Sequence, residues 1–240
     1  MEKKFKDISQ DPQLLKIIHD ALNEDIGSGD HSSLSCISPD KISSAKLIFK
    51  DDGIAAGISI AHTILKINDE QCIITGTIND GDVVKKGDIG FVVEGNAQSL
   101  LKSERLLLNI MQRLSGIATV TAQAVSRIKN SKTRILDTRK TTPNLRLLEK
   151  WAVTVGGGFN HRYGLYDMIM LKDNHVDVAG GVIAAIEKAK KYLSDQHLDL
   201  GIEVETRNLE DYARTGVDFI SLGMLTHSVK SLDISFKIKL

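Results

Sequence analysis

Residues 133–155, TRILDTRKTTPNLRLLEKWAVTV, decide the fold class of this chain. The apolar run within 133–137 predicts a buried strand, and the apolar spacing of 143–155 predicts an amphipathic helix after it. Thr142 can cap that helix, and Pro143 is favoured at its first position. A strand followed so closely by a helix is typical of a parallel α/β architecture.

The alternation of strand and helix continues to residue 222. Further strands are predicted at 168–172, 201–205 and 217–222, and further helices at 179–193 and 208–214. Strands that alternate with helices in this way form a parallel sheet. A complete barrel of this class closes with eight strands and takes about 250 residues for the barrel alone. The four strands predicted here are too few to close one.

The first hundred residues follow a different pattern. A helix is predicted at 11–23, Ile- and Val-rich strands at 45–49, 72–78 and 89–94, and a long helix at 103–129. Within the long helix, Gly116 indicates a break or a close contact. Residues 232–240 alternate apolar and polar side chains, which predicts a half-buried strand that returns to the N-terminal sheet. We therefore expect an N-terminal α+β domain at 1–102, joined by a C-terminal strand at 231–240, and a second domain at 103–230.

Composition limits the classes of function. The chain has 240 residues, 42% of them hydrophobic and 26% charged, and 31 Lys and Arg balance 31 Asp and Glu. A globular protein without net charge attracts neither nucleic acid nor a membrane surface by default, so we expect no partner of either class. The two cysteines and the charged, polar N-terminus favour a cytoplasmic location.

Positive charge is concentrated in one stretch. From Arg134 to Lys172 there are seven Lys or Arg residues and three Asp or Glu residues, a net charge of +4 in a neutral chain. Arg139 and Lys140 follow one predicted strand and Lys172 ends another, where functional groups gather in parallel α/β folds. Arg binds carboxylate or phosphate in a bidentate manner, and Lys adds a compact charge. This pattern predicts a small polyanionic ligand, with a solvated basic turn as the alternative.

Other candidate groups also lie near strand ends. Three glycines at 156–158 precede His161 and Arg162, which indicates that the backbone approaches a ligand or protein closely, or else forms a flexible connector. Glu205 ends a strand and could hold Mg²⁺ through water, bond ribose hydroxyls or form a structural ion pair. Gly223 would let backbone N–H groups approach a phosphate.

Three blocks of sequence carry a family resemblance. LDTRKTTP at 136–143, GGGFNHRYGLYD at 156–167 and LKDNH at 171–175 resemble the signature blocks of quinolinate phosphoribosyltransferase, the carboxylating nicotinate-nucleotide pyrophosphorylase. The resemblance extends to 24–30, 112–119 and 216–228. It implies a TIM-like open (β/α) barrel that follows the N-terminal α+β domain.

The resemblance also implies an activity in NAD biosynthesis. Quinolinate and phosphoribosyl pyrophosphate would give nicotinate mononucleotide, pyrophosphate and CO₂, with Mg²⁺ bound mainly through the pyrophosphate substrate. The family implies a homodimer whose active site is shared between subunits. The implied catalytic residues are Lys140, Lys172 and Glu205, and the implied substrate-binding residues also include Arg105, Thr138, Arg139, His161, Arg162, Leu222, Gly223, Met224 and His227.

The chain departs from the family pattern after the strand at 201–205. Family members continue with further βα units that carry acidic and phosphate-binding segments, whereas here 203–210 runs directly into Asp211. We infer an internal deletion after Asn208, and we expect a truncated barrel that retains quinolinate binding but turns over phosphoribosyl pyrophosphate poorly. The alternatives are a shortened homologue that binds quinolinate or a partner subunit without turnover, and a relative that acts on another pyridine or pyrimidine base.

Overall fold

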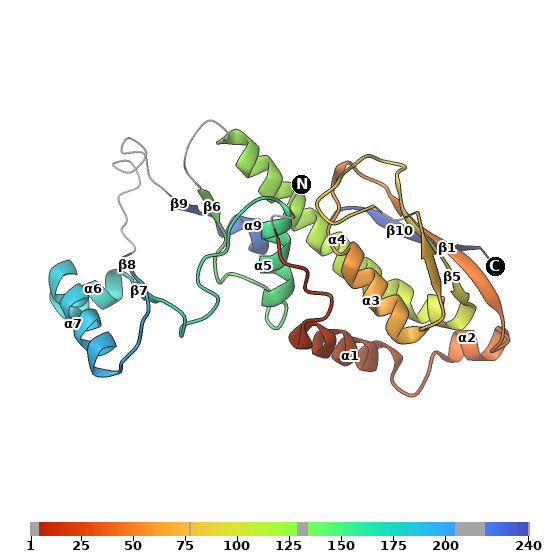
Figure 1. Cartoon of the computed structure of the whole chain (residues 1–240), viewed down its shortest axis with the longest axis horizontal. Helices are drawn as coiled ribbons and strands as arrows, with labels where there is room; N and C mark the ends of the chain where they lie inside the picture. Colours follow the sequence, from red (N-terminus) through yellow and green to blue (C-terminus); the bar gives the residue numbers. More distant parts are fainter. Residues whose placement is uncertain (1–4, 77, 129–133, 205–218, 240) are drawn as a thin grey trace.

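The structure of the protein is a computed structural model that describes residues 5–76, 78–128, 134–204 and 219–239 (Figure 1). Its helices are α1 (Pro12–Ile26), α2 (His31–Cys36), α3 (Ile58–Asn68), α4 (Ala97–Arg127), α5 (Arg146–Val155), α6 (Asp173–Ala179), α7 (Val182–Asp195) and α9 (Met224–His227). Its strands are β1 (Ile42–Phe49), β2 (Gly53–Ile54), β3 (Ile73–Thr75), β4 (Val83–Val84), β5 (Ile89–Asn96), β6 (Arg134–Leu136), β7 (Ile169–Leu171), β8 (Ile202–Val204), β9 (Phe219–Ser221) and β10 (Ile234–Lys239). None of the described helices is long and apolar enough to cross a membrane.

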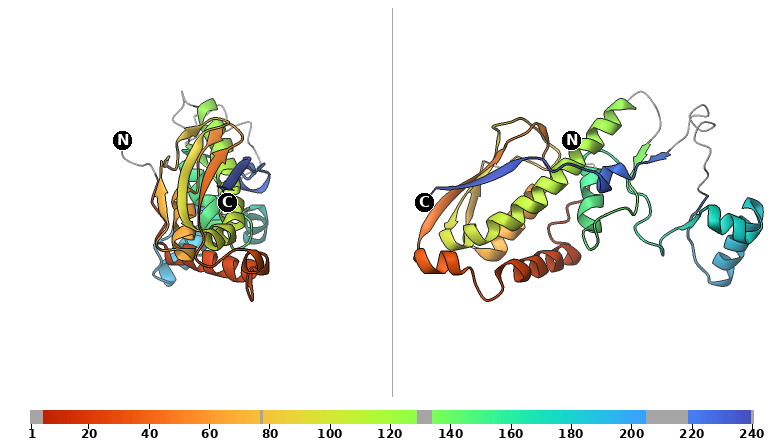
Figure 2. Two further views of the ribbon diagram at one scale, coloured as in Figure 1. Left: turned by 90° about the vertical axis from the view of Figure 1, so that its right-hand side faces the viewer. Right: turned by 180° about the vertical axis from the view of Figure 1, so that it is seen from behind.

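An antiparallel sheet in the order β10-β1-β5-β3 forms the N-terminal domain. β1 alternates buried and outward-facing side chains, and its buried residues Leu47 and Phe49 lie in the main core. The C-terminal strand β10 pairs with β1, from Ser44 opposite Lys239 to Phe49 opposite Ile234, and Figure 2 shows it running beside the sheet. The predicted return of the last strand to this sheet is therefore confirmed.

Helix α3 was not anticipated, because 44–99 read as a succession of strands. Its buried Ile60, Ala61, Ile64 and Leu65 have helical spacing. The Asp80 carboxylate receives the backbone N–H groups of the first turn of α3, which satisfies donors that a helix start leaves unpaired.

The long helix α4 begins at Ala97, earlier than the predicted start at Ser103. Asn96 caps it by accepting a hydrogen bond from the Ser99 N–H at 3.1 Å. Ser103 is instead buried within the helix. Gly116 does not break the helix, because a Cβ there would lie 2.4 Å from the Lys230 carbonyl oxygen, so the residue marks a close contact.

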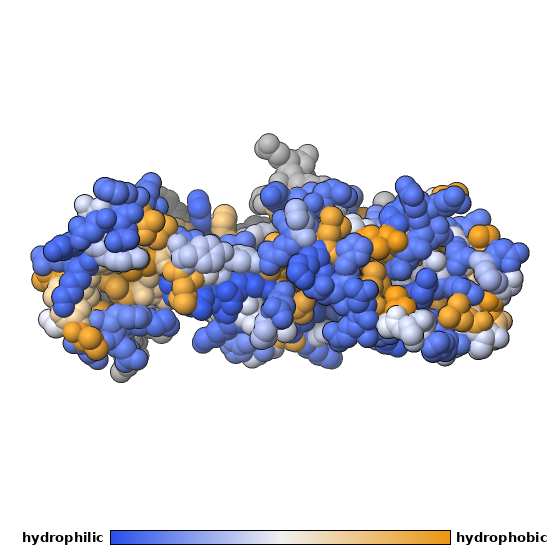
Figure 3. Space-filling view, turned by 90° about the horizontal axis from the view of Figure 1, so that it is seen from below, coloured by the Kyte–Doolittle hydropathy of each residue, from blue (hydrophilic) through white to orange (hydrophobic). Residues whose placement is uncertain are grey.

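The four parallel strands predicted in the second domain are all present, each three residues long. They form two separate pairs, β6 with β9 and β7 with β8, rather than one four-stranded sheet. β7 and β8 pack with α6 and α7 around a small core of their own, and Figure 1 shows this unit at one end of the molecule. Apolar surface remains exposed over this unit (Figure 3), including Val178, Val182 and Ile183.

Two helix boundaries in this domain differ from the prediction. The helix predicted at 179–193 is preceded by the separate helix α6, because Gly180 and Gly181 have φ of 91° and 115° and end it. The helix predicted at 143–155 begins at Arg146, and Thr142 does not cap it. The predicted helix at 208–214 lies outside the described residues.

Candidate active site

A cavity of about 480 Å³ lies at the carboxyl ends of the parallel strands. It is lined by Thr138, Arg139, Lys140, His161, Arg162, Met170, Lys172, Glu203, Ser221 and Gly223. The strands β6, β7, β8 and β9 each contribute a residue at or beside their carboxyl ends. Arginine and lysine side chains from three separate segments therefore converge on one pocket.

The turn after β6 presents two of these cations. The Thr138 hydroxyl accepts a hydrogen bond from the Lys140 N–H at 3.1 Å, which stabilises the turn. Arg139 is half-buried, and its Nε atom is buried without a hydrogen-bond partner among the described residues. Because a buried guanidinium N–H without an acceptor is costly, Arg139 is suited to receive an anionic oxygen from a ligand.

The far end of the same turn is held by a buried ion pair. Arg113 of α4 donates from Nε and Nη2 to Glu149 Oε1, at 3.0 and 2.9 Å, and Glu149 is fully buried. Glu149 also accepts the Thr142 N–H at 3.1 Å and its hydroxyl at 2.8 Å. Thr142 is therefore bonded to a helix side chain instead of capping the helix, and the basic turn is tied to both α4 and α5.

Two of the three glycines, Gly156 and Gly158, bring the chain close to protein, which favours that alternative among those left open by the sequence. A Cβ on Gly156 would lie 2.4 Å from the Ala118 carbonyl oxygen, and one on Gly158 would lie 2.8 Å from Thr121. The backbone here passes against α4 without room for a side chain. The Phe159 N–H then donates to the Ile135 carbonyl at 2.8 Å, so the chain runs beside β6 and brings the following His161 and Arg162 to the pocket.

Glu203 is a pocket residue that the sequence analysis missed. It lies on β8, and its Oε2 is 2.5 Å from His161 Nε2. The predicted acidic residue Glu205 lies outside the described residues. Residues two apart on a strand lie on the same face. The prediction that Glu205 contributes to the site therefore implied that Glu203 would face the site too.

The remaining predicted residues have varied positions. Gly223 lines the pocket, and His227 lines an adjacent hollow with Lys140 and Arg113. Leu222 is half-buried and packs against the main core, and Met224 is exposed. Arg105 is exposed on α4 and does not line the cavity.

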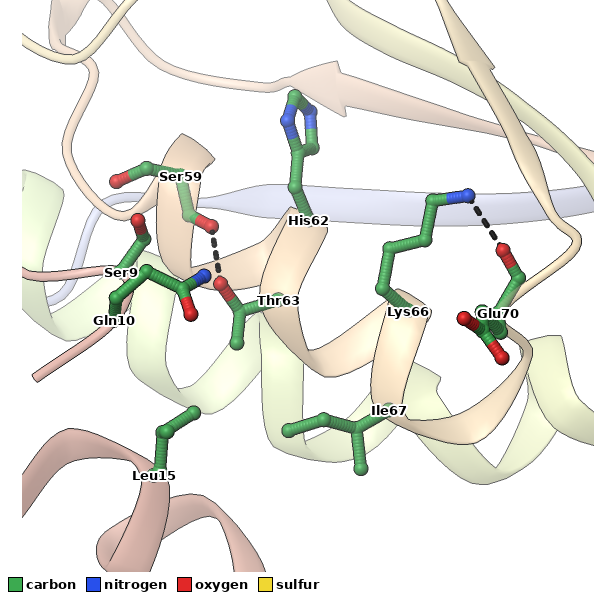
Figure 4. A pocket seen from close by; sticks show the side chains of 9 residues that line it. All are labelled: Ser9, Gln10, Leu15, Ser59, His62, Thr63, Lys66, Ile67 and Glu70. Carbon is green, nitrogen blue, oxygen red and sulfur yellow. Dashed lines mark hydrogen bonds between the residues drawn. The ribbon is translucent and has the colours of Figure 1, made fainter. Parts of the chain in front are cut away.

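A second hollow, of about 640 Å³, lies on the N-terminal domain (Figure 4). His62, Thr63 and Lys66 of α3 line it, and the Lys66 ammonium donates to the carbonyls of Glu70 and Cys72, both at 2.7 Å. Burial lowers the pKa of His62, and the nearby Asp80 opposes that shift. This hollow contains one lysine together with Glu70, whereas the strand-end cavity contains two arginines and two lysines, so the cavity is the better site for a polyanion.

Comparison with known proteins agrees with this geometry. The sequence model for the N-terminal domain of quinolinate phosphoribosyl transferase matches residues 30–115, and the model for its C-terminal domain matches 117–211 and 203–237. The chain belongs to the quinolinate phosphoribosyltransferase family. It is 38% identical to quinolinate phosphoribosyltransferase [decarboxylating] 2b, mitochondrial, of Nicotiana tabacum, over 94% of this chain and 82% of that protein.

Two bacterial relatives are matched over nearly their whole length. A protein of Bacillus subtilis (strain 168) named as a probable nicotinate-nucleotide pyrophosphorylase [carboxylating] is 38% identical, over 95% of this chain and 94% of the relative. The crystal structure of NadC from Streptococcus pyogenes superposes with a TM-score of 0.84 at 32% identity, covering 95% of this chain and 96% of that one.

The same comparisons locate the missing segment. The two matches to the C-terminal family domain overlap at 203–211, which contains the predicted junction at Asn208. The alignment with the Bacillus subtilis relative spans 274 positions, whereas 95% of this 240-residue chain is about 228 residues. About 46 positions of the alignment therefore have no counterpart in this chain, which agrees with the inferred internal deletion.

Proposed function

We propose that this chain transfers the phosphoribosyl group of phosphoribosyl pyrophosphate to quinolinate with decarboxylation. The products are nicotinate mononucleotide, pyrophosphate and CO₂, in NAD biosynthesis. The observation that carries the proposal is the cavity in which Arg139, Arg162 and Lys172 converge, in a chain of this family. Such a set of cations suits a dicarboxylate better than a neutral base, which counts against another pyridine or pyrimidine substrate.

Quinolinate binding is assigned to the arginine-rich side of the pocket. Arg139 offers an unpartnered buried Nε, and Arg162 is oriented by donating from Nη1 to the Met168 carbonyl at 3.1 Å. Lys172, at the end of β7, adds a compact charge, and His161 adds a polar ring beside Glu203. Two carboxylates on adjacent ring carbons can then each meet a cation while the ring nitrogen faces the sugar.

Transfer needs charge in the right places more than covalent chemistry. As the bond from the sugar to pyrophosphate breaks, the leaving oxygen gains negative charge, and its stabilisation is proposed for Lys140, which lines the pocket. The sugar becomes oxocarbenium-like, and the Glu203 carboxylate supplies an opposite charge in the same pocket. Loss of CO₂ then leaves the electron pair of the broken bond on the ring, where a proton replaces the carboxyl group. Glu205 stays a proposed contributor on the sequence pattern.

Mg²⁺ is proposed to bind mainly through the pyrophosphate substrate. The part of the chain that the structure describes contains no group of three His, Cys, Asp or Glu residues placed to hold a metal ion. Mg²⁺ favours oxygen ligands and often bridges substrate phosphates, so the substrate itself is its main source of ligands. The proposed contribution of the protein is to position that substrate through Lys140, Gly223 and His227.

We further propose a homodimer in the cytoplasm. Arg105 is exposed on α4, outside the cavity of its own chain, so a second copy could receive it as a substrate-binding residue. The proposed cytoplasmic location rests on the composition of the chain alone, because several plant relatives are named as mitochondrial or chloroplastic proteins.

Calorimetric titration and a product assay test the proposal together. Quinolinate and phosphoribosyl pyrophosphate are titrated separately into the chain, and nicotinate mononucleotide is then measured by chromatography with both substrates and Mg²⁺ present. We expect binding of quinolinate and formation of product, both weakened in Lys172→Ala. Quinolinate binding without product would instead support the shortened homologue that does not turn over, and no quinolinate binding would overturn both functions.

A further inference from the structure

A buried lysine lies behind the pocket without lining it. Lys150 of α5 is 1% exposed. Its ammonium donates to the Asp137 carboxylate and to the His161 carbonyl, the latter at 3.1 Å. Asp137 directly precedes the turn that carries Arg139, whereas His161 belongs to the segment that follows the three glycines. Lys150 therefore bonds both substrate-facing segments at once.

Asp137 binds the second segment at several points. Its Oδ1 accepts the His161 N–H at 2.8 Å, and its backbone N–H donates to the Phe159 carbonyl at 3.1 Å. With its amide oriented to satisfy both neighbours, Asn160 donates to Asp137 Oδ2 at 2.6 Å and to the Lys150 carbonyl at 2.9 Å. The lysine, the aspartate and the 159–161 backbone thus form one closed hydrogen-bonded network.

Stability alone does not account for this buried pair. Burial raises the pKa of Asp137 and lowers that of Lys150, and the attraction between the two opposes both shifts. Well-packed apolar side chains in place of a buried ion pair are often equally stable or more so. Apolar packing has no preferred geometry, whereas hydrogen bonds have a preferred length and angle. A buried polar network can therefore fix the separation of two backbone segments.

We propose that Lys150 is a positioning residue, which sets the spacing between the turn of Arg139 and Lys140 and the segment of His161 and Arg162. The inference rests on the proposed function, because that spacing determines whether the cations meet both carboxylates of quinolinate. Lys150 itself does not line the cavity. Displacing reacting groups by about 1 Å can cost two orders of magnitude in rate, so a residue behind the site can affect binding strongly.

The test compares Lys150→Met with a variant of similar stability loss elsewhere. Asp80→Ala is the matched control, because it removes a carboxylate that bonds the first turn of α3 in the N-terminal domain. A double variant, Lys150→Met with Asp137→Asn, avoids leaving a buried charge unpaired and so guards against simple misfolding. For each full-length variant, calorimetry gives the quinolinate Kd, thermal unfolding gives Tm, and hydrogen exchange reports on the peptide spanning 157–168.

We expect the quinolinate Kd to rise by about tenfold or more in Lys150→Met and to stay within about twofold in Asp80→Ala. The double variant should recover Tm while its Kd stays raised, and exchange in 157–168 should accelerate in both Lys150 variants more than in the control. An unchanged Kd in Lys150→Met, or full recovery of Kd in the double variant, would overturn the inference. If the parent chain itself fails to bind quinolinate, the proposed function fails, and the exchange measurement still decides whether Lys150 positions the segment.

Discussion

The N-terminal sheet and the parallel strands of the second domain differ in how completely their edges are paired. β1 lies between β10 and β5 and is paired along its length, and its apolar face belongs to the main core. Among the described residues, β8 and β9 each have a single partner strand, and β7 and β8 have a separate small core. The N-terminal sheet shares one continuous core with α4, α5 and β6, whereas β7 and β8 pack separately with α6 and α7.

The unpaired strand edges of the second domain are expected to lower its stability. The two family-model matches overlap at 203–211, from β8 toward β9, so a segment lost there would leave one edge of each strand without a partner strand. Parallel sheets are usually covered on both faces, and the helices beside β7 and β8 leave apolar side chains such as Val178 of α6 and Ile183 of α7 exposed. The comparison predicts that stability and substrate turnover are limited by the second domain.

Restoring the segment should have the largest effect. Insertion of the missing family segment after Asn208 should raise Tm and increase turnover of phosphoribosyl pyrophosphate by about 100-fold or more, because oxyanion-stabilising groups each contribute on that scale. Product formation and thermal unfolding measure the two effects, and quinolinate Kd should change little. A 240-residue chain that already matches a full-length relative in rate would show that the segment is dispensable.

Removing single cations tests whether the pocket binds quinolinate although the parallel strands form two separate pairs. Arg139→Ala and Lys172→Ala should each weaken quinolinate binding by about 1.5–3 kcal/mol, because each loses a charge-assisted hydrogen bond to a carboxylate. Calorimetric titration provides the measurement. Lys190→Ala, at an exposed position on α7, controls for the general loss of positive charge and should leave Kd unchanged. If both pocket variants bind as the parent does, the site assignment is wrong.

The sequence predicted the N-terminal sheet and the location of the pocket by different routes. Alternation at 232–240 anticipated β10, because a half-buried strand needs one apolar and one polar face. The rule that functional groups gather at strand ends anticipated Arg139 and Lys172. Both inferences use information local to one segment, so a deletion elsewhere in the chain did not disturb them.

What the sequence could not reveal depends on contacts between distant segments. Charged residues on a helix are usually read as solvent-facing, yet Glu149 and Lys150 are both buried because each finds a partner outside α5. Because Thr142 bonds Glu149, it does not cap α5, and the helix begins at Arg146. The division of the strands into two pairs likewise depends on which neighbours are missing, which helix and strand patterns do not encode.

A complementation experiment tests whether the exposed face of α4 completes the site of a second copy. Analytical ultracentrifugation at micromolar concentration should show a homodimer. When inactive Arg105→Ala and Lys172→Ala chains are mixed and allowed to exchange subunits, about a quarter of the parent activity should return, since half of the dimers carry one intact shared site. A monomer, or a mixture that stays inactive although each chain dimerises, would contradict a shared site.

The smallest expected effect concerns a carboxylate at the edge of the N-terminal domain. Hydrogen bonds from the Ser33 hydroxyl and N–H hold the pKa of Asp30 below its ordinary value of 3.8, where it caps α2. Because the folded pKa is lowered, the ionised form stabilises the fold above the ordinary pKa, and that contribution disappears as the pH falls through the folded value. Asp30→Asn keeps a capping side chain and removes the charge alone, so the variant should be slightly less stable than the parent at pH 6 and equal to it in strong acid. Urea unfolding of both proteins at each pH measures the difference. A difference that stays constant with pH would show that the Asp30 charge does not contribute to this helix cap.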